Sequence, residues 1–417
     1  MSLREYLKSL RTGFSKSFWI ANTLELFERL AFYGSKAVLT VYLITKVGLE
    51  EEAGTLAGMF SGVIYSLPIV AGVLVDRYGF RKTLITCFGI FTVGYFLIGM
   101  AGMEWSQEIV GVIGKKTYVI GVLLFTAIGG SLIKPCIVGT VAITSKEETR
   151  SQGYSIYYSL VNLGGAIGPI IALQVREDWG IEYVLVMSSF TSLLLFIGTI
   201  LFFKEPESGV ERGEIRTFKK VFTDMLLVFA NFRFMTFLLI FSGFWIMFWQ
   251  IFFLLPSYAT DVLHFEKFEI LETIDAWCII VFSLLMSTLT KKMKPFSAMI
   301  LGIILASVSW IIIGVLGTVT SVVIGVGLYA LGEATQAPRF YEYVSTLAPK
   351  DQVGTFMGFA FLPVAIGSFS AGPLSDWLRL SFMQQNPAMM WYLLAVIGGI
   401  TSTLMLLYNQ FLIRKKV

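Results

Sequence analysis

Charged residues are scarce in this sequence. Asp, Glu, Lys and Arg make up 14% of its 417 residues, hydrophobic residues make up 56%, and the mean hydropathy is +0.75. Soluble domains carry about 25% charged residues, because these keep the surface in water. The scarcity of charge therefore excludes a soluble globular protein of this length and indicates a polytopic membrane protein.

Histidine and cysteine are also rare. The single histidine, His264, falls in a predicted loop, and Cys87, Cys136 and Cys278 lie in apolar runs without the spacing of metal ligands. We expect small buried cysteines, no disulfide, no metal and no other cofactor. Proton chemistry inside a bilayer must then depend on carboxylates paired with Lys or Arg, because the predicted spans contain no imidazole.

Enzyme signatures are missing from the apolar runs as well. The runs contain no histidine cluster, no Gly-x-Ser-x-Gly turn and no paired aspartates of a membrane protease. We therefore expect neither an enzyme nor a nucleic-acid partner. An intramembrane enzyme or a sensor that transports nothing stays open as a different class of function.

What the sequence does contain is a series of long apolar runs. A membrane-spanning helix needs about 20 mainly apolar residues, and such runs recur with short polar breaks, so the predicted fold class is an all-α membrane protein. Twelve transmembrane helices are predicted, over 18–46, 53–75, 83–102, 117–144, 152–174, 183–203, 234–260, 269–290, 296–315, 320–347, 352–378 and 389–412. The longest polar break predicts an N-terminal six-helix bundle over 1–203, a cytoplasmic linker over 204–233 and a C-terminal six-helix bundle over 234–417.

The distribution of positive charge predicts the orientation. Most of the 32 Lys and Arg fall in the two termini and in the loops after even-numbered spans, so the positive-inside rule makes both termini cytoplasmic. The basic start, "MSLREYLKSLRTGFSKS", has no apolar core before a cleavage site and is expected to be retained. We expect a monomeric, multi-pass protein of the cell membrane whose two bundles form a transporter architecture with a midplane site.

The loop after the second span carries a recognisable motif. "GVLVDRYGFRKT" resembles the signature loop of the major facilitator superfamily, Gly-x-Leu-x-Asp-Arg-x-Gly-Arg-Arg/Lys, with Phe80 where the family often has Arg. The resemblance implies the major facilitator fold. Asp76 can accept hydrogen bonds from arginine and cap a nearby helix N-terminus, so we expect Asp76, Arg77 and Arg81 to control conformation.

A narrower resemblance lies in the first span. "ELFERLAFYG" resembles the Glu-x-x-Glu-Arg-Phe-x-Tyr-Tyr-Gly motif of the proton-coupled oligopeptide transporters. It matches this motif at Glu25, Glu28, Arg29, Tyr33 and Gly34. The resemblance implies proton coupling and peptide transport.

Other spans extend this resemblance. Tyr65 lies in "IYSLPI", Lys134 in "IGGSLIKPC", and Tyr158 and Asn162 in "GYSIYYSLVNLGG", each similar to a segment of the same family. In span 10, "GEATQAPRF" makes Glu333 the family's carboxylate for a substrate amine by position.

The second half also departs from the family pattern. In "FWIMFWQ", which holds Trp245, Trp249 stands where the family has its span 7 glutamate. Asp275 in span 8 and the pair Arg339 and Glu342 in span 10 are charges that the pattern does not predict. Arg339 and Glu342 are expected to form a gate pair on the cytoplasmic side.

The charges of the first span form one stripe on a helix. A charge at the bilayer centre costs roughly 2.5 to 3.5 kcal/mol by insertion scales, so the stripe should face a central cavity, where a carboxylate can pair with Arg29 and with Lys134 across from span 4. We expect Glu25 or Glu28 to exchange between a proton and the Lys134 ammonium. A static ion-pair network that only holds the two spans together is the alternative.

Charges on opposite sides of the cavity suit a zwitterion. Glu333 and Asp275 offer negative charge to an amine, while Arg29 and Lys36 offer positive charge to a carboxylate. The expected walls and hydroxyls of the site come from Tyr33, Tyr65, Tyr158, Asn162, Trp245 and Trp249. The sequence thus predicts a proton-coupled secondary transporter of a small zwitterionic solute, such as a di- or tripeptide or an amino-acid derivative. A proton-coupled exporter of amphiphilic compounds is the alternative within transporters.

Overall fold

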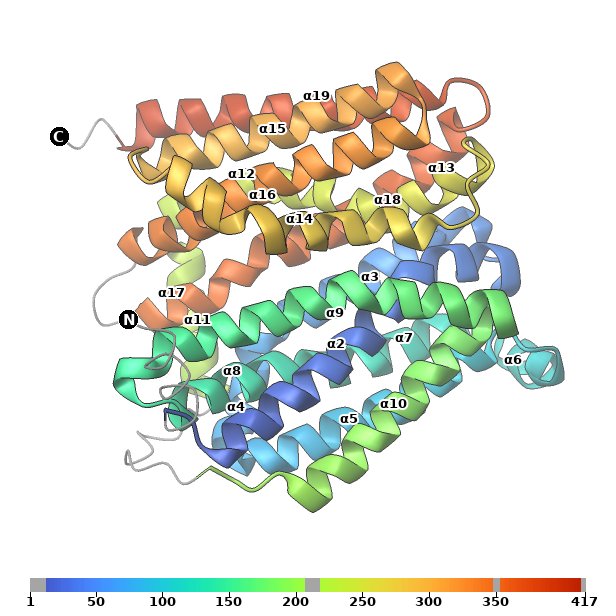
Figure 1. Cartoon of the computed structure of the whole chain (residues 1–417), viewed down its shortest axis with the longest axis horizontal. Coiled ribbons are helices and arrows are strands. Elements are labelled where there is room, and N and C mark those ends of the chain that lie inside the picture. Colours follow the sequence, from blue (N-terminus) through green and yellow to red (C-terminus); the bar gives the residue numbers. More distant parts are fainter. Residues whose placement is uncertain (1–12, 207–217, 348–352, 414–417) are drawn as a thin grey trace. The chain divides into compact units, whose positions relative to one another are not determined.

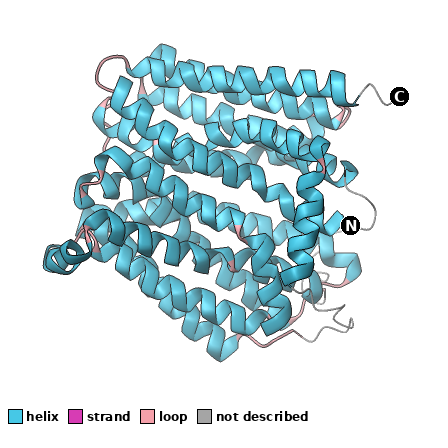
Figure 2. Cartoon of the chain, turned by 180° about the vertical axis from the view of Figure 1, so that it is seen from behind, coloured by secondary structure: helices cyan, strands magenta, loops and turns pink. Residues whose placement is uncertain are grey.

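A computed structural model describes residues 13–206, 218–347 and 353–413 of the chain (Figure 1). These residues are almost entirely helical (Figure 2), apart from one isolated bridge between Phe14 and Ser145. The predicted all-α class is confirmed. The first 12 residues, the charged stretch 207–217 of the predicted linker and the basic C-terminal residues 414–417 lie outside the described part.

The chain folds as two compact units. Unit 1 consists of Met1–Ser35 and Leu67–Val221, and unit 2 consists of Lys36–Ser66 and Phe222–Val417. This grouping differs from the predicted six-plus-six halves in one respect, because residues 36–66 pack within unit 2 although they precede the linker. Helix α2, Lys16–Tyr42, runs without interruption from one unit into the other.

The helices of unit 1 match the first-half spans after the first one closely. Besides the first part of α2, they are α4 (Pro68–Tyr78), α5 (Phe80–Met100), α6 (Gln107–Ile113), α7 (Lys115–Ser131), α8 (Ile133–Thr144), α9 (Arg150–Trp179) and α10 (Ile181–Phe202). Helix α5 lies against α7, α8 and α10, and α9 contacts α8 and α10. The short helix α6 belongs to no predicted span.

The helices of unit 2 cover the second half together with α3. They are α3 (Ala53–Ser66), α11 (Phe218–Ala230), α12 (Phe232–Phe253), α13 (Leu255–Asp261), α14 (Phe268–Leu289), α15 (Pro295–Leu316), α16 (Val319–Leu347), α17 (Val353–Gly358), α18 (Leu362–Phe382) and α19 (Pro387–Tyr408). Helix α16 lies between α14 and α15, and α18 packs on α3 and α12. Figure 1 shows α15, α16 and α19 running side by side.

The spans agree with the prediction in position, but the predicted spans 53–75, 117–144 and 234–260 are each divided into two helices. Ten helical segments in the described part of the chain are long and apolar enough to cross a membrane, and an eleventh is counted if α3 and α4 form one broken span. The remaining predicted span is α16, which is 29 residues long. The predicted continuous helix over 53–75 is wrong: it ends at Ser66 and restarts at Pro68, because proline has no amide hydrogen to continue the ladder.

Small residues allow the close approach of α3 and α18 in unit 2. A Cβ at Gly58 would lie 2.6 Å from the Ser368 carbonyl oxygen, and the Ser368 hydroxyl donates to the Gly58 carbonyl at 3.0 Å. At the start of α3, the Asp376 carboxylate accepts from the amides of Gly54 (2.8 Å) and Thr55 (2.7 Å). Backbone contact and a capped N-terminus therefore join α3 to α18.

Candidate functional site

Four charged side chains of unit 1 form a group that we call the Arg29 cluster: the buried Glu25, Glu28 and Arg29 with the half-buried Lys134. Glu25 is 0% exposed, Glu28 2% and Arg29 3%. The Arg29 guanidinium binds the Glu28 carboxylate through two hydrogen bonds, one from Nε and one from Nη2 to Oε1 at 2.7 Å. Its Nε also lies 3.5 Å from Oε1 of Glu25.

The packing of α9 holds this part of α2 in place. A Cβ at Gly164 would overlap the Cβ of Arg29, and a Cβ at Gly168 would lie 2.7 Å from the Leu30 carbonyl oxygen. The Arg29 guanidinium carbon lies 4.6 Å from the centre of the Phe32 ring, a cation–π distance. The glycines of "NLGGAIGP" thus let two helices approach closely where the charges are buried.

Lys134 enters the cluster from the second helix of a broken span. Helix α7 ends at Ser131 and α8 starts at Ile133, so Lys134 stands at the N-terminal turn of α8. It interacts electrostatically with Glu25, Glu28 and Arg29. The structure therefore brings together the four residues that the sequence selected for proton coupling.

The two carboxylates of the cluster differ in their hydrogen bonds. Glu28 accepts both bonds from Arg29, whereas neither carboxyl oxygen of Glu25 has a hydrogen-bond partner within the described part of the chain. Tyr157, which is buried, lies within electrostatic range of Glu25. Glu28 is fixed by a fork-shaped ion pair with Arg29, whereas Glu25 has no such pair among the described residues and interacts with Arg29, Lys134 and the Tyr157 side chain.

A second charged group lies in unit 2, and we call it the Lys36 cluster: the buried Lys36 and Glu272 with the half-buried Asp275 and Glu333. Lys36 is 4% exposed, and its ammonium nitrogen lies 3.3 Å from the centre of the Phe252 ring and 4.3 Å from the Trp249 ring. It interacts electrostatically with each of the three carboxyls. The sequence selected Lys36, Asp275 and Glu333, and it missed Glu272.

Carboxyl oxygens of this cluster lack hydrogen bonds. Both oxygens of Glu272, Oδ1 of Asp275 and Oε2 of Glu333 are buried and have no partner within the described part of the chain. Glu272 is 3% exposed. One signal could have found it, because Glu272 and Asp275 are three residues apart and so share a face of an otherwise apolar helix.

Trp249 takes the place of the missing span 7 carboxylate as a packed side chain. It is fully buried, its indole nitrogen donates to the Val364 carbonyl at 3.0 Å, and Tyr65 meets its ring edge to face at 5.8 Å. Trp245 is half-buried, with Gly367 packed closely against it. The tryptophans and Tyr65 therefore form a wall beside Lys36.

The remaining predicted contact residues lie in unit 1. The ring of Tyr33 lies 5.9 Å from the Arg29 guanidinium carbon. Tyr158 is 55% exposed, and the Asn162 amide donates to the Tyr158 carbonyl of its own helix at 2.9 Å. Tyr33 thus belongs to the Arg29 cluster, whereas Asn162 satisfies a backbone carbonyl of α9.

The signature loop uses a different acid from the predicted one. Asp76 and Arg77 are exposed, and the N-terminus of α5 is capped by Glu205, which accepts from the amides of Phe80 (2.9 Å) and Arg81 (2.8 Å). The Arg81 guanidinium donates to the Ile200 carbonyl at 2.7 Å. Asp76 therefore does not cap α5 in this structure. Sequence reasoning missed Glu205 because it lies 125 residues beyond the helix that it caps.

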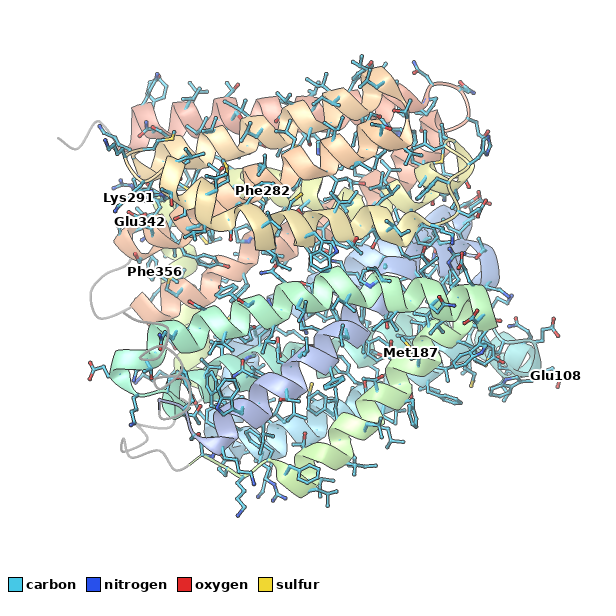
Figure 3. The ribbon with its side chains drawn as sticks, viewed as in Figure 1. Glu108, Met187, Phe282, Lys291, Glu342 and Phe356 are labelled. Atoms are coloured by element: carbon cyan, nitrogen blue, oxygen red, sulfur yellow. The ribbon has the colours of Figure 1, made fainter. Side chains whose placement is uncertain are left out.

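The predicted gate pair forms an ion pair. The Arg339 Nη1 lies 2.8 Å from Oε2 of Glu342, which is labelled in Figure 3, and Nη2 donates to the Thr290 carbonyl at 2.9 Å. Arg339 thereby places its charge at the C-terminus of α14, where the helix dipole is negative. The pair is partly exposed, unlike the two buried clusters.

Comparison with known proteins decides the family. The model of the Major Facilitator Superfamily matches residues 24–372. The chain belongs to this superfamily. Membership identifies a membrane transporter and not an enzyme, and it confirms the predicted major facilitator fold.

Curated relatives within the superfamily are peptide permeases. The dipeptide and tripeptide permeases A of Enterobacter sp. (strain 638) and of Escherichia coli (strain K12) are each 28% identical, over 192 and 194 residues. Each match covers 45% of this chain and 36% of the relative, so the chain matches about a third of the length of these relatives. The resemblance that the first-half motifs predict is confirmed.

Solved structures of the superfamily show the same fold. A POT family transporter in complex with 5-aminolevulinic acid has a TM-score of 0.76 at 17% identity, with 94% of this chain and 96% of that chain covered. A POT family transporter in complex with a thioalcohol-conjugated peptide has a TM-score of 0.77 at 16% identity, with the same coverage.

Proposed function

We propose that this chain is a proton-coupled secondary transporter that moves a small zwitterionic solute, such as a di- or tripeptide or an amino-acid derivative, by alternating access. The observation that carries the proposal is the Arg29 cluster. It holds two carboxylates and two cations in the interior of unit 1, and one of the carboxylates, Glu25, has no hydrogen bond. Glu25 is suited to exchange protons, because a buried carboxylate keeps its charge only while a cation lies beside it.

We assign the proton to Glu25. Protonating Glu28 would break a two-bond ion pair with Arg29, and hydrogen bonds to charged groups contribute about 1.5 to 3 kcal/mol each. Protonating Glu25 breaks no hydrogen bond and releases the Lys134 ammonium from its attraction. Glu25 therefore alternates between a proton and Lys134, while Glu28 and Arg29 stay paired.

The substrate class is proposed from the opposite charges that the two clusters contain and from the relatives. The curated relatives are named dipeptide and tripeptide permeases, and a solved neighbour holds 5-aminolevulinic acid, which carries an amine and a carboxylate. We assign the substrate amine to Glu333 and Asp275 and its carboxylate to Arg29 and Lys36. The aromatic side chains Tyr33, Tyr65, Tyr158, Trp245 and Trp249, with Asn162, complete the proposed contacts.

We further propose that the protein works as a monomer in the cell membrane with both termini cytoplasmic. Asp76, Arg77 and Arg81 in the signature loop and the pair Arg339 and Glu342 would change partners between conformations. Cysteine labelling from each side of intact cells at loop positions in a variant without native cysteines tests the orientation. Labelling of a C-terminal position from outside would contradict it.

Purified protein in liposomes with an inside-alkaline pH gradient tests the function. Dipeptide uptake that collapses when an ionophore dissipates the gradient supports the proposal. Export of amphiphilic drugs without peptide uptake would instead support the exporter, which the aromatic wall around Lys36 makes the second candidate. Solute binding without any flux would overturn both.

A further inference from the structure

The Lys36 cluster is unbalanced in charge. Glu272, Asp275 and Glu333 each interact with Lys36, and within the described part of the chain no other cation acts on them. Three ionised carboxyls against one ammonium would leave a net charge of −2 around Lys36, on the buried Glu272 and the half-buried Asp275 and Glu333. Glu269, fully buried one turn before Glu272, also interacts with it.

Such a net charge is not tolerated in an apolar interior. The desolvation of one ion costs several kcal/mol even after relaxation, and neighbouring like charges add repulsion. Lys36 is also partly compensated by the Phe252 and Trp249 rings, which face its ammonium. The cluster must therefore take up positive charge from outside. No group of His, Cys, Asp or Glu in the described part of the chain is arranged to hold a metal ion, which leaves protons or a substrate amine.

The surroundings of each carboxyl indicate whether it binds the substrate amine or a proton. Glu333 lies on α16 near Tyr329, and the proposed function already assigns it to the substrate amine. Glu272 lies on α14, 3% exposed, with both oxygens lacking hydrogen bonds. Because no hydrogen-bond donor in the described part of the chain contacts Glu272, Lys36 is the group that stabilises its negative charge. Glu272 is therefore the carboxyl of the cluster best suited to carry a proton. Asp275 follows it on the same helical face.

The aromatic wall beside Lys36 has no acid to compete for its charge. Helix α12 contains no Asp or Glu, and its Trp249 indole is bonded to the Val364 carbonyl. We propose that Glu272 of α14 is a second protonation site with Lys36 as its counter-ion, so that each transport cycle takes up one proton here in addition to the proton on Glu25. This rests on the proposed function. The step transfers a proton from water to a carboxylate oxygen and back, without any change in covalent bonds of the chain.

The first test measures proton stoichiometry. In liposomes, the membrane potential that just balances a fixed dipeptide gradient gives the number of protons carried with each peptide. We expect this number to fall by one in the Glu272→Gln variant, with peptide counterflow retained. The control is Glu108→Gln, which changes an exposed carboxyl on α6 of unit 1 (labelled in Figure 3) and leaves the number unchanged. An unchanged number in the Glu272→Gln variant overturns the proposal.

A second measurement does not depend on transport. Infrared difference spectra of the purified protein between acidic and alkaline pH report the carbonyl band of protonated carboxyls. Glu272→Gln should remove part of this band, and Glu25→Gln should remove a different part. A band that Glu272→Gln leaves intact overturns the second site. A wild-type protein without gradient-driven peptide uptake would overturn the proposed function instead, so the two failures are distinguishable.

Discussion

Hydrogen bonding distinguishes Glu25 from Glu28, the two acids of the first-span motif. Both were selected from the sequence because Glu25 lies one turn before Arg29 and Glu28 directly precedes it, and their order along the helix could not rank them. The ranking comes from hydrogen bonding, since Glu28 receives two bonds from Arg29 and Glu25 receives none. Rotamers in a packed interior determine such bonds, and a sequence pattern does not specify them.

Glu25→Gln and Glu28→Gln should therefore fail in different ways. Glu25→Gln should keep its melting temperature and dipeptide counterflow but lose gradient-driven uptake by about tenfold or more, or about 1.4 kcal/mol. Glu28→Gln leaves Arg29 with a weakened partner and should destabilise the protein by about 3 kcal/mol, because breaking a buried pair strands a charge. Thermal unfolding in detergent and uptake in liposomes measure the two effects. Equal losses of stability in both variants would refute the assignment.

Glu272, which was not selected from the sequence, is likewise recognised only from its contacts in the fold. Glu272 has no family motif around it, so an isolated acid in an apolar span attracted no role. Its significance depends on Lys36, which lies more than 200 residues earlier in the chain and meets it only in the fold. Segments far apart in the sequence come together only when the chain packs, so a single sequence does not reveal the contact between Lys36 and Glu272.

At the scale of helices, the hydropathy of the sequence predicts that the helices exist but not where they break. Helix α4 begins at Pro68, and the span containing Lys134 breaks at Leu132 before Pro135. A proline inside an apolar run marks a possible break, but Pro169 and Pro338 lie within unbroken helices. Neighbouring helices decide which prolines interrupt a span.

The close approach of α2 and α9 predicts a matched pair of glycine variants. At Gly168 an added Cβ would lie 2.7 Å from the Leu30 carbonyl oxygen, and at Gly121 on α7 nothing lies within 4 Å. Gly168→Ala should destabilise the protein by about 1 to 3 kcal/mol through overpacking, whereas Gly121→Ala should leave stability unchanged or raise it slightly. Melting temperatures of the two variants decide this, and a Gly168→Ala protein as stable as the wild type would contradict the packing.

The cap of α5 gives a second test at this scale. Glu205 accepts from two amides at the start of α5. Glu205→Ala should destabilise unit 1 by about 1 to 2 kcal/mol, as the loss of other N-caps does. Asp76→Ala, at an exposed residue of the signature loop, should have little effect on stability. The melting temperatures would reject the cap if Asp76→Ala were the more damaging change.

At the scale of the whole molecule, one helix carries a member of each buried cluster. Arg29 and Lys36 both lie on α2, the first in unit 1 and the second in unit 2, and Glu25 precedes Lys36 by 11 residues, roughly 16 Å along an α-helix. The two clusters have no charged member in common. The twelve-helix fold was predictable because hydropathy and motifs act over whole spans. The boundary between the two units within α2 was not predictable from the sequence, because it depends on contacts such as those between α3 and α18.

The two clusters should therefore behave independently in stability. The changes in unfolding free energy caused by Glu25→Gln and Glu272→Gln should add in the double variant to within about 0.5 kcal/mol, as they do for distant sites. Thermal unfolding of the two single variants and of the double variant completes the cycle. A coupling energy above about 1 kcal/mol would show that the clusters act as one network.

The assignment of residues 36–66 to unit 2 has a consequence for dividing the chain. Cutting it in the polar stretch between α10 and α11 gives an N-terminal fragment that contains α3 and a C-terminal fragment that lacks it. The C-terminal fragment would expose the face of α18 that Gly58 covers, and the Asp376 carboxylate would lose the amides that it caps. Neither fragment is thus a complete folding unit. Co-expression should therefore be needed for either one to accumulate.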